Sequence, residues 1–137
     1  MADISPSAST VTWTAGNRWT QGMAGATIVP GNVLYLDSTT NTLKLADGDL
    51  DTESIVVGIA LDSAISGRVC TYAPPGAVIN IGATVTLGTI YVLSLTAGAI
   101  CPWADIGTGD YPNVLFIGAT SNLVELICKK QYAGVHA

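Results

Sequence analysis

The sequence has little charge and few of the residues that build enzyme sites. Of its 137 residues only 11% are charged, with five Lys and Arg against ten Asp and Glu, and there is one histidine. The net charge of −5 does not supply the basic surface that phosphate binding needs, which argues against nucleic acid as a direct partner. His136 alone builds no His-based triad, and the sequence has neither a Gly-x-Ser-x-Gly elbow nor a phosphate-binding loop. We therefore expect a protein that is not an enzyme and needs no cofactor.

Long apolar runs, cysteine pairs and a secretory leader are also missing. Apolar stretches such as 55–61 end well before the roughly 20 residues that a spanning helix needs. Cys70, Cys101 and Cys128 lie far apart and are odd in number, which predicts buried, reduced thiols in a protein made in the cytoplasm. The polar, acidic start of the chain is not a signal peptide. The sequence thus predicts neither membrane association nor a disulfide framework.

Helix signals are nearly absent as well, and strand signals take their place. Short runs rich in Val, Ile and Thr are separated by turns of Gly, Pro, Asn and Thr, and no window has the apolar spacing of an amphipathic helix. This pattern predicts an all-β fold: a single small antiparallel β-barrel or sandwich over 26–137, preceded by an extended N-terminal arm over 1–25. The expected strands cover residues 11–14, 27–29, 33–36, 43–45, 55–61, 68–72, 77–81, 89–93, 100–103, 114–119 and 123–128.

The chain partly repeats itself. Residues 31–43 can be laid on 88–100, 57 positions along, and each copy reads as a strand, a polar turn and a return strand. Further on, Gly58 and its neighbours match Gly118 at an offset of 60. The pattern indicates an internal duplication in which the two units share one core. A chance likeness between two β-hairpins is the alternative.

Charge is also unevenly distributed. No charged residue occurs between Arg68 and Asp105. Surfaces poor in charge are typical of contacts between subunits, so this region is the predicted oligomer interface, and a solvated Thr-rich face is the alternative. The residues that we expect to contribute to the interface are Tyr72, Val78, Ile81 and Tyr91.

Two further groups of residues are candidate sites. Trp13, Arg18 and Trp19 lie in the Gly- and Ser-rich N-terminal segment, where large side chains suggest anchors for docking on a partner. The same segment folding back as a lid on its own chain is the alternative. The carboxylates of Asp47, Asp49 and Asp51 are ligands of the kind that Ca²⁺ prefers, but their order does not fit a known calcium loop. We expect a solvated hairpin loop without a metal.

Several strand-and-turn segments of the sequence form a recognisable set: 26–35, 55–64, Gly67, 75–76, 88–93, 109–111 and 117–119. Together these segments resemble the capsid cement, or head decoration, proteins of bacteriophages. The resemblance implies a non-enzymatic virion protein, assembled in the host cytoplasm, that forms a homotrimer on the outside of the phage head. Its implied partners are further copies of itself and the major capsid protein, whose subunits it would bridge.

Two other functions remain open from the sequence. A trimeric receptor- or glycan-binding knob of a phage tail or fibre would share the β-fold and would use exposed aromatics such as Trp103, Tyr111 and Tyr132. A secreted β-barrel enzyme or lipid binder is a third possibility, against which the missing catalytic residues and signal peptide weigh.

Overall fold

The protein is an all-β fold, as the sequence predicts. The computed structural model describes residues 4, 11–13, 19–47, 55–82, 85–94, 96–103, 113–117, 123–127 and 129–130. These residues contain no helix long and apolar enough to cross a membrane. Their strands are β1 (Thr12–Trp13), β2 (Thr20–Met23), β3 (Val33–Asp37), β4 (Thr42–Leu45), β5 (Val56–Ala60), β6 (Val69–Ala73), β7 (Val78–Asn80), β8 (Ile90–Leu93), β9 (Ile100–Pro102), β10 (Asn113–Ile117), β11 (Leu123–Glu125) and β12 (Lys129–Lys130).

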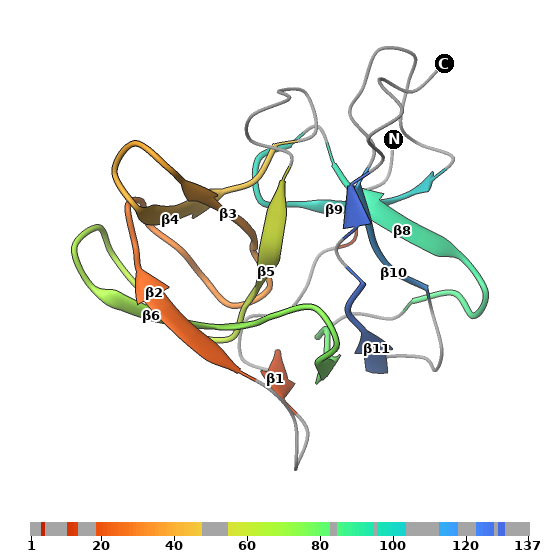
Figure 1. The fold of residues 1–137 in the computed structure, drawn as a ribbon. Coiled ribbons are helices and arrows are strands. Elements are labelled where there is room, and N and C mark those ends of the chain that lie inside the picture. Colours follow the sequence, from red (N-terminus) through yellow and green to blue (C-terminus); the bar gives the residue numbers. More distant parts are fainter. Residues whose placement is uncertain are drawn as a thin grey trace.

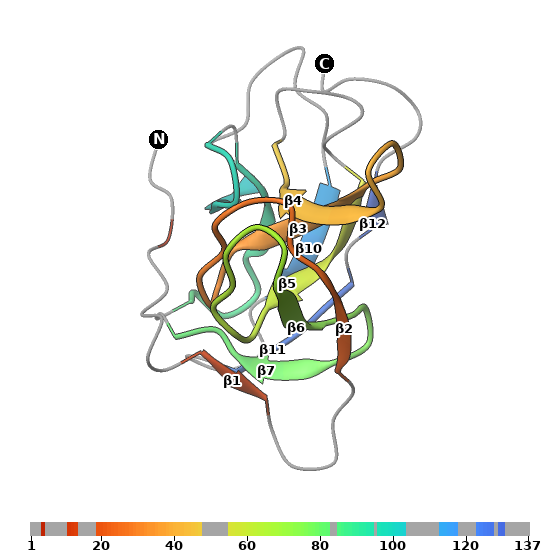
Figure 2. The ribbon, with the colours of Figure 1, turned by 90° about the vertical axis from the view of Figure 1, so that its left-hand side faces the viewer.

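The strands form three open antiparallel sheets in a sandwich-like arrangement, not a closed barrel. The five-stranded sheet has the order β2-β6-β5-β3-β4, and the four-stranded sheet has the order β12-β10-β8-β9. In Figure 1 the first lies on the left of the molecule and the second on the right. The third sheet, β1-β7-β11, runs beneath both, as Figure 2 also shows.

The N-terminal segment joins these sheets. Ile4 forms an isolated bridge with Ile100, β1 pairs with β7, and β2 is an edge strand paired with β6. In these places the N-terminal segment pairs with other parts of its own chain. The strand expected over 27–29 is reduced to a single bridge between Ile28 and Ala64.

Both halves of the chain contain the same hairpin in the same register. In β3–β4, Leu34 lies opposite Leu45, and in β8–β9, Tyr91 lies opposite Pro102. Residues 34 and 91 are 57 positions apart, and so are 45 and 102. The two hairpins therefore have the same strand register, which agrees with the predicted duplication.

The third strand of each unit is duplicated too, but with a different offset from the one predicted. The β3–β5 and β8–β10 pairs each shift register at the same point, so Val56 corresponds to Val114, 58 positions along. Gly58 therefore corresponds to Phe116, and the predicted match with Gly118 is wrong by two positions. We call β3–β4–β5 the first unit and β8–β9–β10 the second unit.

The main hydrophobic core joins the two units. Val33 and Ile59 of the first unit belong to one buried cluster with Tyr91, Leu93 and Phe116 of the second. The opposite face of the first unit is covered by a separate cluster, which contains Leu34, Leu43, Ala24, Ile28 and Cys70. The first unit is therefore buried on both faces.

Candidate functional site

The described residues hold no cluster of side chains that could bind a metal ion. No group of three or more His, Cys, Asp or Glu lies together within them. Of the three acids weighed as calcium ligands, Asp47 lies in the described part of the chain, while Asp49 and Asp51 lie outside it.

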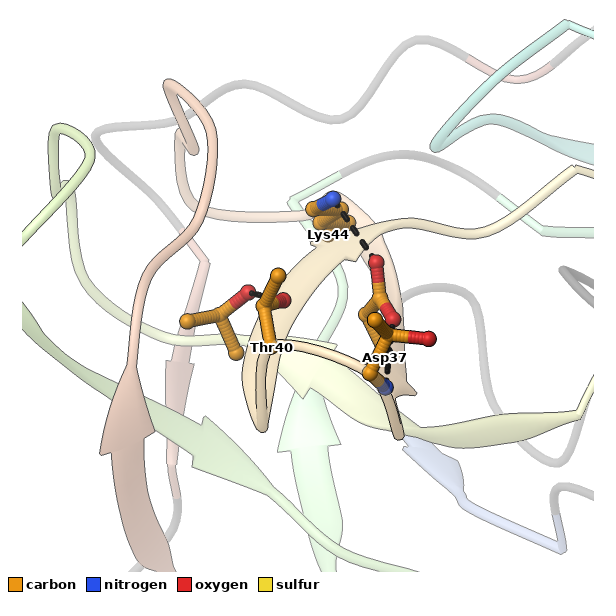
Figure 3. A network of polar contacts seen from close by, with 5 residues as sticks. Asp37, Thr40 and Lys44 are labelled. Atoms are coloured by element: carbon orange, nitrogen blue, oxygen red, sulfur yellow. Dashed lines mark hydrogen bonds and ion pairs between the residues drawn. The ribbon is translucent and has the colours of Figure 1, made fainter.

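A network of polar contacts stabilises the β3–β4 hairpin. Lys44 Nζ lies 2.8 Å from Asp37 Oδ2, and the Thr39 backbone N–H donates to Asp37 Oδ1 at 2.9 Å (Figure 3). The turn closes through Asn41, whose φ of 56° lies in the left-handed region that Asn tolerates. The hydrogen bond from Lys44, followed by that from Thr39, holds the pKa of the Asp37 carboxyl below its ordinary value. The network is a hairpin clamp, and it engages the one lysine of this hairpin in an ion pair.

Replacing Asp37 with asparagine should flatten the acid side of the stability curve. The pKa of Asp37 is lowered from 3.8 in the folded chain, so its ionised form favours folding above this value, and the contribution is lost as pH falls through the folded pKa. Melting temperatures measured from about pH 6 to about pH 2 should therefore fall less for the variant than for the wild type. The margin should be small because the ion pair is partly exposed to solvent. Lys44→Met should flatten the curve in the same way. A variant curve parallel to that of the wild type would contradict this role.

The described cysteines are structural. Cys70 and Cys101 are buried, as predicted, and Cys128 lies outside the described residues. Burial, with a smaller contribution from Asp62, raises the pKa of the Cys70 thiol to about 11. Burial also raises the pKa of the neighbouring Tyr72 phenol. Cys70 therefore stays protonated at neutral pH and is a poor nucleophile.

A small hollow lies between the turns that precede β3 and β9. Its volume is about 150 Å³, and its lining comes from residues 29–32, residues 97–100 and Ile4. None of these residues is ionisable, and the volume is below the roughly 300 Å³ at which ligand pockets begin. The hollow lacks the groups that would act on a substrate.

An uncharged, largely apolar surface covers the outside of the β2–β6 ribbon. Met23 lies directly opposite Val69, and both are exposed, while Gln21 lies opposite Thr71 and donates from Nε2 to its Oγ1 at 3.2 Å. Trp19, just before β2, is 52% exposed, and strand alternation puts it on the same side as Gln21 and Met23. We call these five residues the ribbon face. At the left edge of Figure 1, β2 and β6 lie away from the second unit.

Of the predicted docking residues, Trp19 lies on the ribbon face. Trp13 is in β1, where its backbone pairs with Ile79, and only this backbone is described. Arg18 lies outside the described residues. Met23 and Val69 were not found from the sequence, because their pairing depends on a register between segments 46 positions apart.

The predicted interface residues divide into two kinds. Tyr72 and Val78 are half-buried, whereas Ile81 and Tyr91 are buried in the main core. The Tyr91 ring stacks on Phe116 with centroids 5.2 Å apart, and its hydroxyl accepts a hydrogen bond from the Thr86 N–H at 2.8 Å. Ile81 and Tyr91 are therefore not exposed for a contact with another chain.

Comparisons of the chain with protein-family models, with curated protein sequences and with solved structures give no match. The function is therefore inferred from the chain's own residues.

Proposed function

We propose that the chain is a capsid cement protein: a homotrimer that binds the outer surface of a bacteriophage head and bridges major capsid subunits. The ribbon face, with Trp19 at one end, is the observation that carries this proposal. In this proposal the chain lies on the outside of the capsid in the virion, and its direct partners are the major capsid protein and further copies of the chain.

The chemistry of the ribbon face suits docking on a protein. Trp19, Met23 and Val69 offer exposed apolar area, and the face contains no charged side chain that would have to lose its water on binding. Tryptophan is among the residues that most often dominate the binding energy of an interface. A trimer presents three such faces, so that modest affinity at each is multiplied into tight attachment to a shell of repeated subunits.

The test is co-sedimentation of the purified chain with capsids that lack it, from the phage that encodes it. We expect the wild type to bind and Trp19→Ala to lose about 2 kcal/mol per contact, roughly a 30-fold loss in affinity at each site. Trp103→Ala is the matched control, because Trp103 is also exposed but lies beside β9 in the other sheet. Equal binding by Trp19→Ala and the wild type would contradict the role of the ribbon face.

A glycan-binding knob is the second candidate, and Trp103 is the observation that favours it. Its ring is 38% exposed, and exposed tryptophans are common platforms for apolar faces of ligands. The other two aromatics in this hypothesis, Tyr111 and Tyr132, lie outside the described residues. Failure of the wild type to bind capsids, combined with binding to a glycan array that Trp103→Ala abolishes, would replace the cement function with this one.

A further inference from the structure

One pair of equivalent positions is buried in the first unit and open in the second. Val33 of β3 lies opposite Ile59 of β5, and both are 0% exposed. The corresponding residues of the second unit are Ile90 and Ile117, which also lie opposite each other but are 39% and 44% exposed. We call Ile90 and Ile117 the second-unit pair. Large aliphatic side chains are thus present at both sites, but the chain covers only one of them.

The first unit shows what covers this position. Val33 and Ile59 lie in the main core with Tyr91 and Phe116, which occupy the other face of the second unit. The face of the first unit that contains Val33 and Ile59 therefore shares a core with the face of the second unit that contains Tyr91 and Phe116. These two faces are not equivalent, because Tyr91 and Phe116 correspond to Leu34 and Gly58 of the first unit. The buried cluster that contains this aliphatic pair thus includes residues of the second unit, together with Ile79 of β7 and Val124 of β11.

The described residues contain no third unit that could cover the second-unit pair. Along the same side of the sheet, Val92 and Cys101 are buried with Val114 in a small cluster of their own, and the open surface begins at Ile90 and Ile117. Figure 1 shows β8 and β10 on the right of the molecule, far from the ribbon face on the left. The two apolar surfaces are therefore separate, and occupation of one leaves the other free.

We propose that the second-unit pair is the contact between copies of this chain, arranged so that the pair of one copy meets the same pair of the next around a symmetry axis. The face of the first unit that contains Leu34 and the equivalent face of the second unit, which contains Tyr91, are already buried in two separate clusters. Among the described residues of the second unit, the exposed apolar side chains are Ile90 and Ile117. We therefore place this pair at the threefold axis of the trimer, where a residue meets the same residue of the neighbouring copies. This inference rests on the homo-oligomer in the proposed function, but not on capsid binding.

Ile117→Lys tests the contact by its effect on oligomeric state. A symmetric contact would bring the new lysines of neighbouring copies together and bury their charges, so we expect the oligomer to dissociate at least 10-fold more readily in light scattering coupled to gel filtration. Leu36→Lys is the matched control, because Leu36 is 45% exposed on β3 of the first unit and should leave the oligomer unchanged. A monomeric wild type, or an Ile117→Lys oligomer as stable as that of the control, would overturn the proposal.

Cross-linking gives a second measurement that does not depend on the tolerance of a lysine. In a Cys128→Ser background, Ile90→Cys or Ile117→Cys should form a disulfide between copies on mild oxidation, because residues beside a symmetry axis approach their own copies. Leu36→Cys should remain a monomer on a non-reducing gel. Absence of a cross-link from both isoleucine positions would also overturn the proposal. An oligomer that depends on Ile117 but does not bind capsids would refute the cement function and leave this contact standing.

Discussion

Replacing Gly58 with alanine should lower the free energy of unfolding by about 3 kcal/mol, at the upper end of the usual range for overpacking. A Cβ at Gly58 would meet the carbonyl oxygen of Ala73, and it would lie 2.8 Å from Tyr72 Cδ2. The obstacle is mostly backbone, and β5 is held against β6 by the pairing of Ile59 with Ala73. The strand cannot move away without breaking this pair. Chemical denaturation of the purified variant measures the loss.

Gly67→Ala is the control that separates steric conflict from backbone strain. Gly67 has a φ of 90°, but nothing lies within 4 Å of the position of a Cβ there. Its substitution should therefore cost about 1–2 kcal/mol, the strain of a left-handed conformation alone. A loss at Gly58 that is no larger than the loss at Gly67 would mean that β5 and β6 can separate locally.

Gly58 also shows why the third strand of the repeat could not be aligned from the sequence. In the first unit β6 crosses closely at Gly58, whereas the second unit has Phe116 at the same place, stacked on Tyr91. The two residues share a position but no chemistry. A match of glycine to glycine, Gly58 to Gly118, therefore selects the wrong offset. The hairpins could be aligned because both keep an apolar strand, a polar turn and an apolar return.

The strands that were predicted are those whose own side chains favour a pleated, half-buried surface. β3, β5 and β8 are rich in Val, Ile, Leu and Tyr and were expected from that composition. β2 was missed because its sequence, Thr-Gln-Gly-Met, has little strand preference of its own. Its conformation comes from pairing with β6 along all four residues, which is tertiary information.

The candidate surfaces were only partly visible in the sequence for a related reason. Trp19 was a candidate docking residue from the sequence because large aromatics in a Gly- and Ser-rich segment suggest anchors. A stretch without charged residues, however, is expected in a hydrophobic core as well as in an interface, and Ile81 and Tyr91 belong to the core. Burial separates the two, and burial depends on how the second unit packs on the first.

Replacing Phe116 with alanine should cost about 4 kcal/mol, because truncating a buried aromatic leaves a cavity as well as losing transfer free energy. Phe116 is fully buried and stacks on Tyr91 with an interplanar angle of 28°. Phe116→Leu, which keeps most of the volume, should lose only about 1.5 kcal/mol. Urea unfolding curves of the two variants provide the comparison. A loss for alanine as small as that for leucine would mean that the neighbouring strands close over the cavity.

The same variant tests whether the two units unfold together. The core around Phe116 contains Val33 and Ile59 of the first unit as well as residues of the second, so its loss weakens both. Single-tryptophan versions of Phe116→Ala would report each sheet separately, with Trp19 beside β2 and Trp103 beside β9. We expect both fluorescence transitions to shift to the same lower urea concentration. If Trp103 reported unfolding before Trp19, the second unit would be separable from the first. We expect a joint transition because the two units share one core, so that weakening this core removes packing from both.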